Sequence, residues 1–330
     1  MPTDFDSTVQ YQGPKAAFAS ITGSPLWGLT VQDVLAAAQA RGWTLHSSQR
    51  LPTPYGLGPL VNHLTTAAGR DILWIPSYGG VRGEDGARHQ HGHKTFWILW
   101  QAGVQVLLIG GTSGVADWRH SEEAIRPGDV VLPWSFRTKP GHGGLPGTPY
   151  ETFWPDHDVL LDDPFCPDLA RRLHQRFQDY VERGSIRRVH TPADVRVALV
   201  VPDAPTFESD FDILMWLSIS KMASDLQPER PPIATLHGDC VNPVLARHLG
   251  IHVMYYHMVS NYAQGLGVDH DIAGTLYDLY LHTFPPIALD VEFSLLESAA
   301  IPGGGECRCV SDVHEAPHVF RYAMTQSQPE

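Results

Sequence analysis

Cysteine, positive charge and long apolar runs are all scarce in this sequence of 330 residues. Four cysteines are too few for a disulfide scaffold, so we expect a protein of the reducing cytoplasm. The chain has 23 basic and 36 acidic residues, and such an acidic surface repels phosphate backbones. No apolar run approaches the roughly 18 residues of a membrane span, and Met1–Gln10 lacks a signal-peptide profile. We therefore expect neither a nucleic-acid polymer nor a membrane as a partner.

Two of the cysteines lie one residue apart, at Cys307 and Cys309 near the C-terminal end. This spacing is compatible with a strained redox pair or with one edge of a metal site. It is also compatible with two unrelated thiols in a loose tail, which is the interpretation we favour from the sequence.

Apolar runs alternate with amphipathic segments along the chain, which predicts an α/β fold. Expected strands begin at Asp71, Val104, Val130, Val195 and Ile251, and the second of them ends at Gly110. Expected helices run from Pro167 to a stop at Gly184, from Asn242 to Gly250, and from Asp271 to about Leu296 with a break at Pro285-Pro286. We expect one domain over residues 16–300, a flexible N-terminal segment over 1–15 and a C-terminal tail over 301–330. The Gly- and Pro-rich stretch Thr138–Tyr150 is a long loop, either a lid or an insertion.

Several segments, in order and at compatible spacings, resemble the trimeric purine nucleoside phosphorylases and their relatives the methylthioadenosine phosphorylases. They start at Ile21 (ITGSPLWGL), Thr53 (TPYG), Leu107 (LLIGGTSGV), Ile125 (IRPGDVV) and Ala204 (APTFES), and the best match runs ungapped from Thr235 to Asn261. The resemblance covers roughly residues 16–300. It implies a single α/β domain with a mixed, partly barrelled central sheet flanked by helices, and a homotrimer.

The resemblance places Asn261, Glu208 and Phe207 around the purine base. A carboxamide such as that of Asn261 can donate to O6 and accept from a protonated N7. The methylthioadenosine branch has Asp-x-Asp here, so Asn261 favours a 6-oxopurine. Alternatively, Asn261 caps a turn at a strand end, and Glu208 is a helix N-terminal carboxylate favoured by the helix dipole.

On the sugar side, the resemblance implies that His270 contacts the 5′-hydroxyl. At the ribose 2′/3′ position the family has Met, and this chain has His237, followed by Gly238 and Asp239. His237 and Asp239 could hold sugar hydroxyls or act as a base and water pair. They could also cap the turn between a strand and a helix.

The predicted phosphate site departs most from the family pattern. Ser24 matches the family's first-loop hydroxyl, but Pro25 replaces a Gly whose N–H would help bind an anion. Thr112 and Ser113 lie on the central turn and could supply N–H or hydroxyl donors. The family's Arg-His pair falls on Ser77-Tyr78 in the length-preserving register. A competing register, which needs paired insertions and deletions, restores it as Arg88 and His89.

The histidines His89, His91 and His93 alternate, but no carboxylate or cysteine motif accompanies them, so we expect no metal there. We likewise expect no cofactor, with inorganic phosphate as a co-substrate.

The function expected from the resemblance is cleavage of a purine N-glycosidic bond by phosphorolysis. The reaction needs a held sugar, a stabilised purine anion and a nucleophile beneath the anomeric carbon. A phosphate-independent hydrolase, or an enzyme acting on a modified nucleoside, is the second hypothesis, with Asp239 or Glu84 positioning water. A non-catalytic nucleoside-binding protein is the third, because a fold alone does not prove activity.

Overall fold

The structure, a computed structural model, describes residues 8–76, 88–137, 161–200, 208–237, 242–263, 266, 277–303 and 307–310. Of residues 88–91 and 242 it describes the backbone only. No helix in these described ranges is long and apolar enough to cross a membrane.

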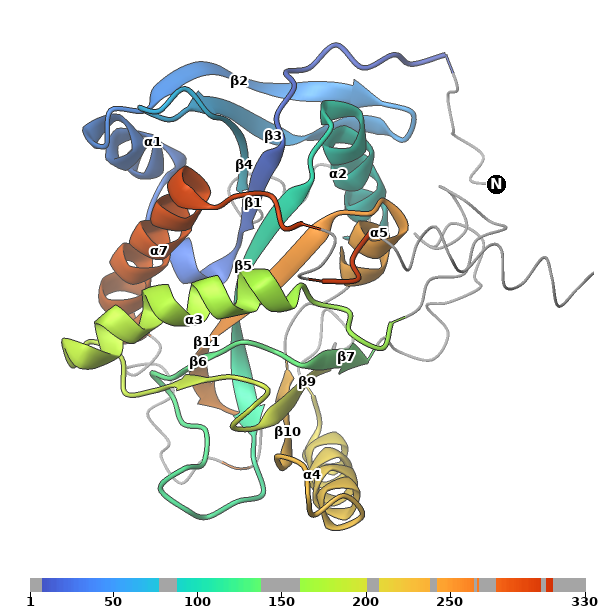
Figure 1. Ribbon diagram of the computed structural model, residues 1–330, viewed down its shortest axis with the longest axis vertical. Coiled ribbons are helices and arrows are strands. Elements are labelled where there is room, and N and C mark those ends of the chain that lie inside the picture. The colour runs from blue at the N-terminus through green and yellow to red at the C-terminus, as the bar shows by residue number, and fades with distance from the viewer. Residues whose placement is uncertain are drawn as a thin grey trace, which may run out of the picture.

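The described chain forms one mixed sheet of eleven strands flanked by helices, which confirms the predicted fold class (Figure 1). The strands are β1 (Phe18–Thr22), β2 (Thr44–Thr53), β3 (Gly56–Thr65), β4 (Asp71–Pro76), β5 (Val106–Ala116), β6 (Val130–Val131), β7 (Ser135–Arg137), β8 (Val189–His190), β9 (Arg196–Val200), β10 (Ile233–His237) and β11 (His252–Tyr262).

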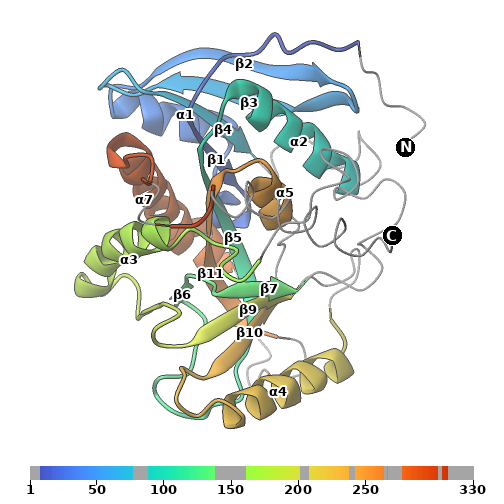
Figure 2. The same cartoon turned by 45° about the vertical axis from the view of Figure 1, so that its right-hand side comes forward.

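The helices lie on both sides of this sheet. In both views α1 (Val31–Ala40), α3 (Pro167–Glu182) and α7 (Phe284–Ser298) lie on one side, and α2 (Arg88–Ala102) and α5 (Asn242–His248) on the other (Figure 2). The helix α4 (Asp210–Asp225) packs against β10 at one end of the molecule. Two short turns complete the order: the 3-10 turn η1 (Ser24–Leu26) and the π-helical turn η3 (Leu279–Thr283).

The long strand β5 is the centre of the sheet. Its first half pairs in parallel with β1, where Thr22 lies opposite Gly110, and its last residues pair antiparallel with β10. Strand β11 runs in parallel along nearly the whole of its other edge. Residues Val106–Ile109 are buried because strands flank them on both edges and helices cover both faces. One strand therefore brings the ends of β1, β10 and β11 together.

Local sequence signals explain most helix boundaries. Helix α3 begins with Pro167 at its first position, buries Leu169, Leu173 and Phe177, and is followed by Gly184 at a φ of 72°. This agrees with the predicted helix and stop. The expected break at Pro285-Pro286 takes a different form: the π-helical turn η3 leads directly into α7, and both prolines lie in the first turn of α7.

The sheet encloses one main hydrophobic core, which extends from Ala16 to Cys309. Residues 8–15 lie against α2, where Lys15 Nζ donates to the carbonyl of Gln101. The proposed boundaries at residues 15 and 300 stay predictions, and the predicted loop Thr138–Tyr150 lies outside the described residues.

Candidate active site on the central strand

Residues 110–114 of β5 bring together four of the sequence-predicted site residues. Thr112 belongs to this stretch, and Ser24 follows β1, which pairs with β5 up to Gly110. At Gly114 the two neighbouring strands place His237 on one side and Asn261 on the other. Residues two apart on a strand are about 7 Å apart and lie on the same face of the sheet. Ser24 beside Thr112, and His237 and Asn261 beside Gly114, therefore lie close together along β5.

The predicted phosphate residues form a chain of hydroxyl groups. Thr112 donates to Ser24 Oγ twice, from its backbone N–H at 3.0 Å and from its hydroxyl at 2.6 Å. The Tyr280 hydroxyl lies 2.6 Å from Thr112 Oγ1, and it is the donor when Thr112 donates to Ser24. Within this series of hydrogen-bonded hydroxyl groups, the proton that none of the bonds uses is that of the Ser24 hydroxyl. It is free to point toward an anion. Each bond polarises the next, so the Ser24 hydroxyl becomes a stronger donor.

An irregularity in β11 sets the orientation of Asn261, which is predicted to bind the purine base. The register with β5 shifts between Val259 and Asn261, so that Ser260 is the extra residue of a bulge. Ser260 Oγ donates to Asn261 Oδ1 at 2.7 Å, and Asn261 Nδ2 donates to the carbonyl of Tyr262 at 2.7 Å. The amide nitrogen carries a second N–H, and Oδ1 has a second lone pair, so the carboxamide can still bind a ligand through both ends.

Gly114 leaves the space in which the Asn261 amide lies. A Cβ at Gly114 would lie 3.1 Å from Asn261 Nδ2 and 3.4 Å from the Cα of Ala263. A side chain there would force the amide to move, which explains why the strand has glycine at the position between His237 and Asn261.

His237 lies buried beside Glu208. Its Nδ1 is 3.9 Å from Glu208 Oε2, too far for a hydrogen bond, and the two side chains are 2% and 8% exposed. Burial lowers the pKa of His237, while Glu208 and Asp212 oppose the shift. Neither ring nitrogen has a hydrogen-bond partner in the described part of the chain. A neutral, buried imidazole with unused nitrogens is a group that can bind a sugar hydroxyl.

Glu208 directly precedes the capping box that starts α4. Ser209 accepts from the Asp212 N–H, and the Asp212 carboxylate accepts from the Ser209 N–H. The position therefore fits the alternative of a helix N-terminal carboxylate, and it also puts Glu208 next to His237. The role of Glu208 in binding the base stays a prediction.

Behind the site, His257 supports β5 from the opposite face. Its Nδ1 lies 2.6 Å from Ser113 Oγ, and a Cβ at Gly111 would lie 2.7 Å from its Cε1. Burial lowers the pKa of His257 to about 4, against a smaller opposing effect of a backbone hydrogen bond with Thr112. His257 is therefore neutral at pH 7 and acts as a packing and hydrogen-bonding partner of β5.

We expect His257 to make the protein less stable in acid. Between pH 6.5 and about 4 only the unfolded chain protonates this histidine, so the free energy of unfolding falls as the pH falls through that window. The loss attributable to His257 is about 3 kcal/mol by pH 4. Urea unfolding of the wild type and of His257→Gln at pH 7 and pH 4 measures it. Equal losses in the two proteins would contradict the assignment.

Comparison with solved structures identifies the architecture. Methylthioadenosine phosphorylase from Schistosoma mansoni in complex with adenine has a TM-score of 0.62 and 13% identity, covering 90% of this chain and 98% of its own. A variant of the adenosine/methylthioadenosine phosphorylase of the same organism, also with adenine, has a TM-score of 0.64 and 13% identity, covering 94% and 99%. A methylthioadenosine phosphorylase from an antarctic soil metagenomic library has a TM-score of 0.58 and 14% identity, covering 92% and 99%.

The chain has the nucleoside phosphorylase fold. At such low identity the likeness establishes the fold alone. No protein-family model and no curated protein sequence matches the chain.

The other sequence-predicted site residues lie outside this geometry. Asp239, Phe207 and His270 are outside the described residues, as are Ser77-Tyr78. Arg88 and His89 begin α2, and only their backbone is described. The roles of these residues and the choice between the two registers stay predictions.

Sequence reasoning missed Tyr280, which completes the hydroxyl chain. It lies 168 residues after Thr112, within the π-helical turn η3, and its ring contacts Trp27 edge-on at 5.4 Å. Turns of this type often occur at functional sites. The nearest sequence signal is the Pro285-Pro286 pair, which marked an irregularity in this helix without pointing to the tyrosine.

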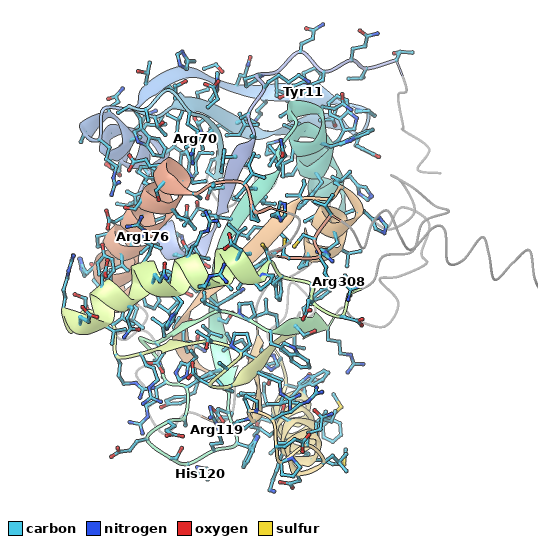
Figure 3. The ribbon with its side chains drawn as sticks, in the orientation of Figure 1. Tyr11, Arg70, Arg119, His120, Arg176 and Arg308 are labelled. Carbon is cyan, nitrogen blue, oxygen red and sulfur yellow. The ribbon has the colours of Figure 1, made fainter. Side chains whose placement is uncertain are left out.

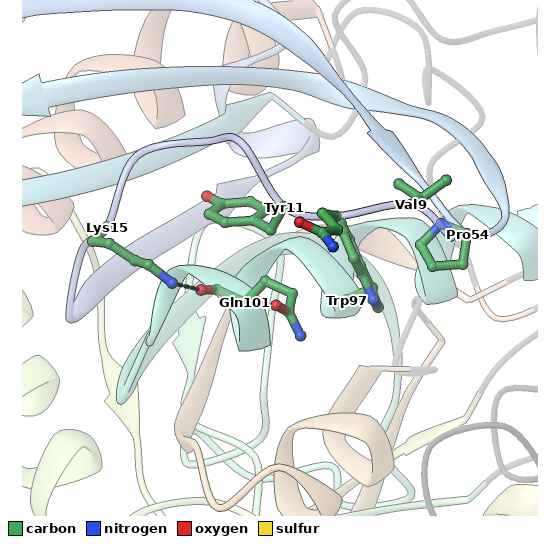
Figure 4. A pocket seen from close by; sticks show the side chains of 7 residues that line it. Val9, Tyr11, Lys15, Pro54, Trp97 and Gln101 are labelled. Carbon is green, nitrogen blue, oxygen red and sulfur yellow. Dashed lines mark hydrogen bonds between the residues drawn. The ribbon is translucent and has the colours of Figure 1, made fainter. Parts of the chain in front are cut away.

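Two cavities of the described surface lie away from this site. One of about 440 Å³ is lined by Val9, Gln10, Tyr11, Lys15, Pro54, Trp97 and Gln101 (Figure 4). Another of about 450 Å³ lies between α3 and α7, beside Arg176 (Figure 3). Neither contains a residue of the β5 site, which is recognised by its convergence of polar groups.

Proposed function

We propose that this protein cleaves the N-glycosidic bond of a purine nucleoside by phosphorolysis, giving the free base and ribose 1-phosphate. The observation that carries the proposal is the arrangement along β5. A hydroxyl chain suited to an anion lies at Thr112, and a buried imidazole and a carboxamide flank Gly114. The neighbours of the same fold that are bound to adenine or methylthioadenosine support a purine nucleoside as the substrate class.

Each group has a defined task in this reaction. A phosphate oxygen forms a bond to the anomeric carbon while the bond from that carbon to N9 breaks, and its electron pair passes to the purine. Asn261 donates to the purine oxygen or N7 as negative charge develops there. Glu208 accepts from N1–H of the base, and His237 holds the ribose. Ser24 and Thr112 bind phosphate, with Arg88 and His89 as its predicted cationic partners and Phe207, His270 and Asp239 in their predicted roles.

We propose a 6-oxopurine as the base, on the argument that a carboxamide both donates and accepts at the O6/N7 edge. Incubating the protein with inosine, guanosine and methylthioadenosine, with and without phosphate, and chromatographing the products tests both proposals. Base release that needs phosphate and yields ribose 1-phosphate supports phosphorolysis. Release without phosphate makes the protein a hydrolase, and no release with any substrate contradicts the proposed activity.

We expect Ser24→Ala to raise KM for phosphate by about 10- to 100-fold, because a hydrogen bond to a charged group contributes about 1.5–3 kcal/mol. Ser24→Thr keeps the hydroxyl and is the matched control. Initial rates at varied phosphate, with nucleoside saturating, separate this effect from base binding. An unchanged KM for phosphate in Ser24→Ala would remove Ser24 from the phosphate site.

We further propose a homotrimer, which the sequence resemblance implies. The outer face of α4 exposes a stripe of large apolar side chains, each more than half exposed: Phe211, Leu214, Met222 and Leu226. Such a stripe is typical of a surface that another chain covers. Light scattering should give three times the chain mass of 36.5 kDa for the wild type and a lower mass for Leu214→Ser. A monomeric wild type would contradict the trimer.

A further inference from the structure

Four metal-ligating side chains from three distant segments meet outside the proposed active site. They are Cys166 before α3, His252 at the start of β11, and Cys307 and Cys309 near the C-terminal end. Their ligand atoms all lie within 4.8 Å of one another. The sequence interpretation of Cys307 and Cys309 as unrelated thiols is therefore wrong, because the fold brings both to a third cysteine and a histidine.

The distances between these atoms suit a tetrahedral ion. His252 Nδ1 lies 3.1 Å from Cys307 Sγ and 3.8 Å from Cys166 Sγ. Zinc binds sulfur at about 2.3 Å and imidazole nitrogen at about 2.0–2.1 Å, which puts neighbouring ligand atoms of a tetrahedron about 3.5–3.8 Å apart. None of the three cysteines forms a disulfide. Three cysteines and one histidine are a complete ligand set for structural zinc.

The position of Cys166 favours a thiolate. Cys166 is the N-cap of α3, where the positive end of the helix dipole stabilises an anion. The cluster is nearly closed to solvent, since Cys166, His252 and Cys309 are all buried.

A buried cation balances the charge of the cluster. Zinc with three thiolates carries a net charge of −1, and Arg247 of α5 is fully buried. Arg247 Nη2 donates to the carbonyl of Arg308, the residue between the two cysteines, which places this cation beside the cluster. A buried anionic group is stable when a paired charge accompanies it.

We propose that Cys166, His252, Cys307 and Cys309 bind one zinc ion, which fastens the C-terminal segment to α3 and β11. On binding, the thiol protons pass to solvent and the three sulfurs and Nδ1 fill the coordination sphere. The site is closed and therefore structural. His252 and Asn261 lie at opposite ends of β11, about 30 Å apart along the strand, so the ion is separate from the proposed active site.

The test uses the full chain, purified without a metal-affinity step and supplied with zinc during expression. Elemental analysis should find about one zinc per chain in the wild type and in the control Cys240→Ser, which removes the fourth cysteine of the sequence. Cys307→Ser, Cys309→Ser and His252→Gln should each lose it. Wild-type protein with no bound zinc, or variants that all retain it, would overturn the proposal.

A second measurement does not depend on folded variants. Cobalt exchanged into the wild-type protein should give visible ligand-field bands and a near-ultraviolet thiolate-to-cobalt charge-transfer band, as three sulfur ligands require. Titrating the thiols of the zinc-loaded wild type with a mercurial should release the zinc to a colorimetric indicator. A cobalt protein without the charge-transfer band overturns the proposal, as does a disulfide between any two of the three cysteines in the protein as isolated.

Discussion

Asn261→Ala should lower kcat/KM for the purine nucleoside by about 10²–10³-fold, the loss typical of removing one donor to a developing negative charge. The structure explains why this residue carries so much of the effect. The bulge at Ser260 fixes the amide at both ends, through Ser260 Oγ and the carbonyl of Tyr262. The donor is therefore preorganised, and no other carboxamide pairs with β5 at Gly114.

The matched control for this variant is Asn261→Asp, which keeps the shape and changes the pattern of donors and acceptors. It should lose activity on inosine and guanosine and gain relative activity on a 6-aminopurine nucleoside, because a carboxylate accepts from the exocyclic amine and N7–H. Base release measured with each nucleoside gives the ratio. If Asn261→Ala retains wild-type kcat/KM, then Asn261 does not contact the base, and the alternative of a turn-capping asparagine applies.

Much of the fold was predictable because its local signals agree with the tertiary structure. The buried run at Asp71–Pro76 and the helix opened by Pro167 both match in type and extent. The length of β5 was less predictable. The expected strand ended at Gly110, yet β5 continues to Ala116, because β10 and β11 supply hydrogen-bonding edges from far along the chain. Glycine is depleted in strands, so the glycines at 110, 111 and 114 give little strand signal without those neighbours.

Some residues of the candidate site could likewise be predicted from the sequence, and others could not. Asn261, Glu208 and His237 were accessible from the sequence because they belong to segments with a recognisable order. Tyr280 was not, since its partner Thr112 is 168 residues away and it belongs to no local motif. The cluster of Cys166 and His252 with the C-terminal cysteines was missed for the same reason: a spacing of one residue showed only two of its four members.

Glu292→Leu should lower the free energy of unfolding by about 3–5 kcal/mol, because it leaves buried hydroxyl donors without an acceptor. The fully buried Glu292 Oε2 accepts from Ser20 and Thr22, each at 2.7 Å, and Oε1 accepts from the Tyr256 hydroxyl. Glycine at position 110 makes room for this cluster, since a Cβ there would lie 2.9 Å from Oε1. Ser20 and Thr22 remain 3.2 Å apart and can bond to each other, which limits the loss.

Glu292→Gln is the matched control and should cost less, because it keeps two polar atoms in the same shape. Burial raises the pKa of Glu292 above its ordinary value of 4.5, while the three hydroxyl donors oppose the rise. The folded protein therefore holds this proton more tightly than the unfolded chain, and stability from Glu292 declines as the pH rises from 4.5 through the folded pKa. Glu292→Gln should remove that decline when urea unfolding is measured from pH 4.5 upward.

If the free energy of unfolding of Glu292→Leu is within about 1 kcal/mol of that of the wild type, the hydroxyl groups find other partners. If it instead costs several kcal/mol and also raises KM for phosphate, the carboxylate that holds the end of β1 also fixes the position of Ser24, two residues further along the chain.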